Sequence, residues 1–181
     1  MEEAKLHTII KECQQNKAHS QRILFNYMYN YGMNVASRYG KTTQEAEEIA
    51  NDGFYKALKY INKYDFQKPF LVWVRRIIIN SAIDHFRKNE RGNVLPLNSQ
   101  PVHNTAHATM NREYLESLVH RLPDQQKMVF MLHVMEEFTH DEIAKELKIS
   151  KGTSKSNLAK ARKKLQQMIA QVQKLEKENG A

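Results

Sequence analysis

Cysteine and long apolar runs are the first things that this 181-residue sequence lacks. Its only cysteine is Cys13, which excludes an intramolecular disulfide and a cysteine-based metal site. Its longest apolar runs, FLVWV and III, fall far short of the ~18 residues that a membrane span requires. The N-terminal MEEAKLHTII is acidic and has no long apolar core of the kind found in a secretory signal. We therefore expect a cytoplasmic protein without membrane insertion.

Glycine and proline are also scarce, with six and four residues, and alternating strand patterns are missing. Long patterns of helical period fill most of the chain, which predicts an all-α protein. The exception is the segment from Gly92 to Asn111, which has no Asp, Glu, Lys or Arg and contains Pro96 and Pro101. We interpret it as a flexible linker between two small helical domains, at residues 1–91 and 112–181.

Apolar spacing and start signals place the helices within each half. In the first half we expect helices at about 3–17, 20–39, 43–62 and 70–88, with the loop KYDFQKP before the last. In the second half we expect helices at 112–121 and 124–135. A capping-box pattern at Thr139 to Glu142 then starts a short helix that ends near Lys148, and Ser150 is suited to cap a final basic helix.

The final helix carries an unbalanced positive charge. From Lys148 to Lys164 there are seven basic residues and no acidic one, and the whole chain has a net charge of +8. This favours a polyanionic partner, with nucleic acid ahead of an acidic membrane surface. At about 100° per residue, one face is apolar: it comprises Leu158, Ala161, Leu165, Met168, Ile169 and Val172.

The opposite face of that helix is the candidate DNA-reading surface. Short polar side chains can reach base edges, and lysines can hold phosphates. A short helix, a turn and this helix together predict a helix-turn-helix. A solvated charged face is the alternative. One residue departs from the usual helix-turn-helix pattern, because Lys148 lies in the turn, where glycine is common. The candidate residues are Lys151, Thr153, Lys155, Ser156, Asn157, Lys160, Lys163 and Lys164.

A second candidate surface lies on the apolar helix that begins at Phe70. Trp73, Arg76, Asn80, Asp84 and Arg87 share one side of it, and this mixture can contact phosphates and unpaired bases. The alternative is that Trp73 anchors the core and the arginines are merely solvated.

The expected helix at 43–62 has the opposite charge. From Thr42 to Tyr55 there are four acidic residues and no basic one, which suits contact with a basic protein surface. A solvated acidic helix start explains most of these residues equally well.

Signals of catalysis are missing. We find no paired acids, no nucleophile with a base and no phosphate-binding loop, so we expect neither an enzyme nor a cofactor. His103 and His107 are four residues apart, but they lie in the expected linker without a third ligand, so we expect no metal.

Taken together, these segments resemble the bacterial RNA polymerase sigma factors of the extracytoplasmic-function (ECF) class. The resemblance runs from about Ser20 to Met168. It is carried by QEAEEIANDGFYKALKYINKYD and FLVWVRRIIINSAIDHFRK in the first half. In the second half it is carried by LPDQQKMVFMLHVMEEFTHDEIAKELKISKGTSKSNLAKARKKL.

The resemblance implies a role for each half. The first would bind core RNA polymerase and the −10 promoter element, and the second would bind the −35 element. An anti-sigma factor is a further partner common in this class. Core polymerase would be bound through Glu48, Asn51, Asp52, Phe54 and Leu58. The −10 element would be bound through Phe66, Lys68, Trp73, Arg76, Asn80, Asp84 and Arg87.

Four departures from the family pattern mark where it transfers least well. Gly53 stands where a larger polar residue is usual, and Lys148 replaces the turn glycine. Ser154 and Asn157 stand where a valine and often an arginine occur. The alternative function is a conventional helix-turn-helix regulator that binds duplex DNA without core polymerase. The linker would either thread toward the RNA path of the polymerase or act as a plain spacer.

Overall fold

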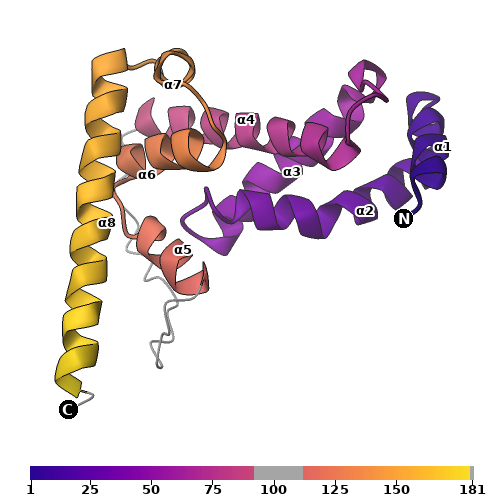
Figure 1. Ribbon diagram of the computed structural model, residues 1–181. Coiled ribbons are helices and arrows are strands. Elements are labelled where there is room, and N and C mark those ends of the chain that lie inside the picture. The colour runs from indigo at the N-terminus through magenta and orange to yellow at the C-terminus, as the bar shows by residue number, and fades with distance from the viewer. Residues whose placement is uncertain (92–111, 180–181) are drawn as a thin grey trace. The chain divides into compact units, whose positions relative to one another are not determined.

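The computed structural model describes residues 1–91 and 112–179, and the side chains of residues 1–90 and 114–173. The described residues form helices and no strand, which confirms the expected all-α fold (Figure 1). The chain divides into two compact units, Met1–Pro101 and Val102–Ala181. No helix in the described part combines the length and apolar character needed to cross a membrane. The expected linker at 92–111, with His103 and His107, lies outside the described residues.

Four α-helices and one short 3₁₀ turn form the first unit. They are α1 (Glu3–Gln14), α2 (Ala18–Ala36), α3 (Thr43–Lys59), the 3₁₀ turn η1 (Ile61–Lys63) and α4 (Phe70–Arg91). The expected helix at 3–17 ends early, because Asn16 adopts a left-handed conformation with φ 59°. The helix expected to reach residue 62 ends at Lys59 and continues as η1.

Three helices of the first unit, α2, α3 and α4, pack against one another through two glycines. A Cβ on Gly53 would lie 2.7 Å from Ile78 Cγ1, and one on Gly32 would lie 2.3 Å from Phe54 Cε1. Both glycines therefore allow a neighbouring helix to approach their backbone. Gly53, a departure from the family pattern, faces α4 and not the surface.

Cys13 belongs to the apolar core of the first unit. It is buried with Leu6, Ile9 and Ile10 on one side of α1. Burial, with a smaller contribution from the charge of Glu12, raises the pKa of the thiol to about 11. The thiol is therefore protonated and unreactive near neutral pH.

The second unit contains α5 (Arg112–His120), α6 (Asp124–Phe130), the π-helical turn η2 (Met131–Met135), α7 (His140–Leu147) and α8 (Lys151–Asn179). Both α6 and α7 pack on α8. Leu158 and Ala161 are buried, and Leu165, Met168, Ile169 and Val172 are half-buried, which confirms the expected apolar face. The helix expected at 124–135 instead becomes π-helical after Phe130. Beyond this turn the Phe138 amide donates to the Leu132 carbonyl at 2.9 Å.

The expected helix starts in the second unit are confirmed. Thr139 forms a capping box with Glu142 at the start of α7. Ser150 Oγ accepts a hydrogen bond from the Thr153 amide at 2.9 Å, which caps α8. Between these helices Lys148 has φ 56° and ψ 41°, so the lysine stands in a left-handed position that glycine adopts without strain.

Two histidines join η2 and α7 to α8. The rings of His133 and His140 stack with their centroids 4.5 Å apart and their planes 14° apart. His133 Nδ1 donates to the Phe138 carbonyl at 2.8 Å, and His140 Nδ1 lies 2.9 Å from Oγ of the fully buried Ser154. The stacked rings and the Ser154 contact therefore tie η2 and α7 to α8.

The left-handed lysine predicts a stabilising substitution. Lys148→Gly removes a backbone strain of about 1–2 kcal/mol from the folded state. It also increases the conformational entropy of the unfolded state, which lowers the stability by about 0.5–1 kcal/mol. We expect a net gain of roughly 0.5–1 kcal/mol in the free energy of unfolding, measured by urea denaturation. As a control, Lys145→Gly within α7 should instead cost about 1 kcal/mol. Equal losses from both substitutions would contradict the assigned backbone strain.

The histidine pair predicts an acid-sensitive second unit. Burial lowers the pKa of His140 below its ordinary 6.5, and electrostatic repulsion from His133, Lys155 and Lys151 lowers it further, against an opposing effect of Asp141. The unfolded chain therefore binds a proton more readily than the folded chain. Stability from His140 is complete above pH 6.5 and is lost as the pH falls below that value.

Urea denaturation at several pH values between 5 and 8 measures this effect. His140→Gln should be less stable than the parent at pH 8, and its stability should fall less steeply below pH 6.5. Parallel stability curves for the two proteins would show that His140 does not carry the pH dependence.

Candidate nucleic-acid and partner surfaces

The outer face of α8 presents exposed cationic and polar side chains. Lys155, Ser156, Lys160, Lys163 and Lys164 are exposed, as expected. Arg162, which was not among the candidates, is exposed as well, and its position within the basic stretch could have identified it.

At the N-terminal end of α8, several polar side chains already form contacts within the second unit. Lys151 Nζ lies 2.7 Å from Asp141 Oδ2, the Thr153 and Ser150 hydroxyls are 2.8 Å apart, and Ser156 Oγ donates to the Thr153 carbonyl. Asp141 thus contributes a negative charge beside the candidate DNA surface. The exposed lysines from Lys155 onward are better placed for phosphates.

The expectation that Asn157 projects outward is wrong. Its relative exposure is 7%, and its Nδ2 donates to Gln125 Oε1 of α6 at 3.1 Å. Asn157 lies three residues after the buried Ser154 and four before the buried Ala161, so helical geometry turns it toward the domain interior. It ties α6 to α8 and is removed from the candidate base-reading residues.

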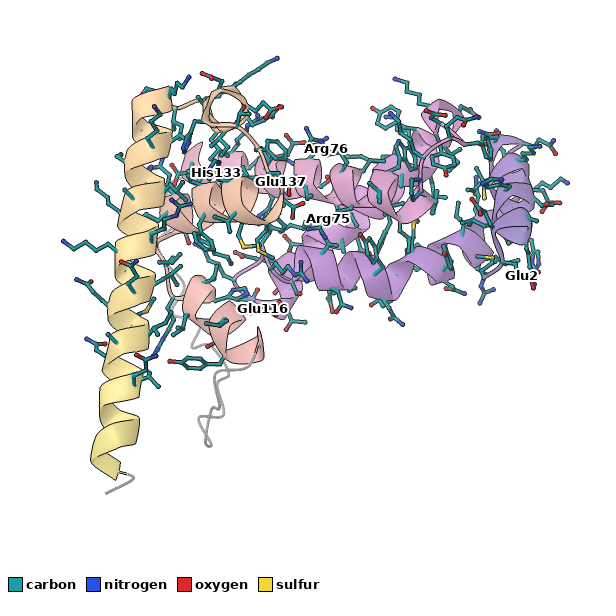
Figure 2. The ribbon with its side chains drawn as sticks, viewed as in Figure 1. Glu2, Arg75, Arg76, Glu116, His133 and Glu137 are labelled. Carbon is teal, nitrogen blue, oxygen red and sulfur yellow. The ribbon has the colours of Figure 1, made fainter. Side chains whose placement is uncertain are left out.

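On α4 the candidate side chains differ in exposure. Arg76 and Asn80 are exposed, whereas Arg75, next to Arg76 on the helix, is half-buried (Figure 2). Trp73 is half-buried, with its ring centroid 5.4 Å from Tyr64 and 5.8 Å from Phe70. Part of the Trp73 ring is exposed, while the rest packs on neighbouring aromatics.

Asp84 and Arg87 belong to an ionic cluster between α3 and α4. Lys56 Nζ lies 2.7 Å from Asp52 Oδ2 and 3.0 Å from Asp84 Oδ2, and Arg87 Nη1 lies 3.3 Å from Asp84 Oδ1. Burial lowers the pKa of Lys56, but its hydrogen bonds to the two carboxylates outweigh that effect and the net pKa is raised. The ammonium therefore remains charged and holds α4 on α3.

The loop at 65–69 connects η1 to α4. Lys68 is exposed, while Phe66 is half-buried between His7 and Tyr64, with ring centroids 5.1 Å from each. The two candidates of this loop thus differ, because Lys68 faces solvent and Phe66 packs within the unit.

The candidate polymerase-binding residues lie along α3. Glu48, Asn51 and Asp52 are exposed, and Leu58 is half-buried. Phe54 is 1% exposed, so the expectation that it contacts a partner is wrong; its ring fills the space beside Gly32.

Tyr55, which sequence reasoning missed, is 63% exposed. It follows Glu48 by seven residues and Asn51 by four, so the helical period places it on their face. That spacing was the available signal, and it makes Tyr55 the aromatic residue of the exposed α3 face.

Comparisons with known proteins agree with this arrangement. The sigma-70 region 2 family model matches residues 24–92, and the sigma-70, region 4 model matches residues 112–165. The ECF RNA polymerase sigma factor SigW of Bacillus subtilis is 26% identical over 144 residues, which cover 69% of this chain and 75% of SigW. SigM of the same organism is 27% identical over 126 residues, covering 66% of this chain and 77% of SigM.

A solved structure shows the same fold. It is the sigma factor RpoE in complex with the anti-sigma factor NepR from Bartonella quintana, with a TM-score of 0.53 and 18% identity over 82% of this chain and 96% of RpoE. The two sigma-70 regions occur in order and together span more than half of the chain. The chain therefore belongs to the sigma-70 family of RNA polymerase sigma factors, in its ECF class.

Proposed function

We propose that the chain is a dissociable initiation subunit whose two units divide promoter recognition between them. Residues 1–91 bind core RNA polymerase through α3 and the −10 element through α4 and the preceding loop. Residues 112–181 bind the −35 element through α8. The observation that carries this division is the presence of an exposed Arg76 and Asn80 face in one unit and an exposed lysine face in the other.

The α4 face supports DNA opening by capture of a separated strand. Arg76 and Asn80 offer hydrogen bonds, and the half-buried Trp73 offers a ring edge to unpaired bases. Unpaired bases present their hydrogen-bonding edges only after the duplex melts, so binding them shifts the equilibrium toward the open promoter. The protein itself supplies no catalysis and needs no cofactor for this role.

The α3 face supports docking on core polymerase. Its exposed residues Glu48, Asn51, Asp52 and Tyr55 combine negative charge with one exposed aromatic ring. Charge favours association with a basic protein surface, and an aromatic residue is a frequent source of interface energy. Phe54 and Gly53 contribute only indirectly, by placing α3 against α2 and α4.

Covalent connection of the two units explains how two modest contacts select a promoter. Binding of one unit makes binding of the other effectively intramolecular, so affinity for the paired elements exceeds that for either one. A cytoplasmic location follows from this role. Since RpoE was solved with an anti-sigma factor, we also propose a protein inhibitor as a partner of this chain.

Association with core polymerase is the direct test. We expect the purified chain to co-purify with core enzyme and to direct run-off transcription from specific promoters. A conventional regulator would instead bind a palindromic duplex tightly without polymerase. Absence of core association together with such duplex binding would refute the proposal in favour of that alternative.

A matched pair of substitutions in α8 tests the assignment of its faces. Lys160→Ala removes an exposed cation and should weaken promoter binding roughly 3–10-fold, with a shallower salt dependence and unchanged stability. Asn157→Ala removes the hydrogen bond to Gln125 and should lower the free energy of unfolding by about 1 kcal/mol. Promoter affinity by fluorescence anisotropy and stability by urea denaturation measure the two effects. If Asn157→Ala weakened promoter binding without lowering the stability, Asn157 would belong to the DNA-binding face after all.

A further inference from the structure

We propose that α1 is a positioning element for −10 recognition, because His7 holds Phe66 and thereby fixes the loop at 65–69. This inference rests on the proposed function of α4 and its preceding loop. His7 lies outside the segment that matches the sigma-70 region 2 model, which begins at residue 24. Phe66 in this reading is a support for the loop and not a surface for stacking bases.

The loop has a defined local structure. Asp65 Oδ1 accepts a hydrogen bond from the Gln67 amide, and the Asp65 carbonyl accepts one from the Lys68 amide, each at 3.0 Å. The Tyr64 hydroxyl donates to the Lys68 carbonyl. The Pro69 carbonyl then accepts bonds from the Val72 and Trp73 amides in the first turn of α4. The loop conformation is therefore continuous with the start of α4.

One face of α1 lies along the segment that leads into this loop (Figure 1). His7 and Gln14 are seven residues apart, so they share a helical face. Gln14 Nε2 donates to the Ile61 carbonyl at 3.2 Å, and the His7 ring meets the Phe66 ring edge to face, with centroids 5.1 Å apart and planes at 88°. The two contacts hold η1 and the loop at separate points.

The adjoining apolar face of α1 fixes the position of this helix. Leu6, Ile9, Ile10 and Cys13 are buried, which sets the rotation of α1 on the rest of the unit. His7 is consequently presented to Phe66 from a helix that packs on α2 as well as on η1.

The Phe66 contact extends to the exposed face of α4 through neighbouring rings. Phe66 meets Tyr64 with centroids 5.1 Å apart, and Tyr64 meets Trp73 with centroids 5.4 Å apart. His7, Phe66, Tyr64 and Trp73 form a continuous series of ring contacts. A change at His7 therefore reaches both the loop and Trp73 without altering any exposed candidate residue.

Hydrogen exchange in the free protein tests the loop directly. In His7→Ala the Gln67 and Lys68 amides should exchange roughly 3–10 times faster, whereas His7→Phe should retain an edge-to-face contact and its protection. Thr8→Ala is the matched control, because Thr8 is the exposed neighbour of His7 on α1. Unchanged protection of both amides in His7→Ala would overturn the proposal.

Promoter opening with core polymerase supplies the functional readout. His7→Ala should slow opening roughly 3–10-fold, His7→Phe should restore it, and affinity for core polymerase should be unchanged in both. Faster loop exchange with normal opening would also overturn the positioning role, provided that Asn80→Ala opens poorly in the same assay. If Asn80→Ala opens normally, the proposed role of the α4 face fails, and the exchange data still decide whether His7 holds the loop.

Discussion

The first unit depends on the close approach of α3 and α4 at Gly53. A single Cβ at this position would lie 2.7 Å from Ile78 Cγ1, so any larger residue would push the two helices apart. The same spacing allows Lys56 to reach Asp84 across the interface. Because α3 carries one candidate surface and α4 carries the other, this contact sets the angle between the two candidate surfaces. The departure from the family pattern at Gly53 is therefore a matter of internal packing.

Polar residues in both units divide into those that hold helices together and those that are exposed on the candidate surfaces. On α4, Ser81 and Asp84 contact Lys56, while Asn80 is exposed. On α8, Ser154 and Asn157 contact α7 and α6, while their neighbours Lys155 and Ser156 are exposed. Adjacent residues thus serve different purposes, because each step along a helix turns the side chain by about 100°. The fold and the candidate surfaces are specified by interleaved positions of the same segments.

Sequence periodicity predicted most helices, their capping residues and the apolar face of α8. It failed at Asn157 because a polar side chain was assumed to point outward, and its partner Gln125 is distant in sequence. At Phe54 the family resemblance failed and not the periodicity, because a family motif was taken as a surface motif, whereas the ring packs beside Gly32. The π-helical turn at η2 was not predicted, because apolar spacing alone does not distinguish it from a continued helix. The signal that places both Asn157 and Phe54 in the interior is the angle of each side chain around the helix axis relative to a buried neighbour.

The lone thiol of Cys13 makes the native sequence suitable for spectroscopic labelling. Its buried position and raised pKa keep it unreactive toward maleimide dyes at neutral pH. Cysteines introduced at exposed positions such as Gln15 and Gln166, one in each unit, would therefore take up the dye without removal of the native residue. A donor and acceptor pair placed in this way would report the separation of the two units in solution and on a promoter.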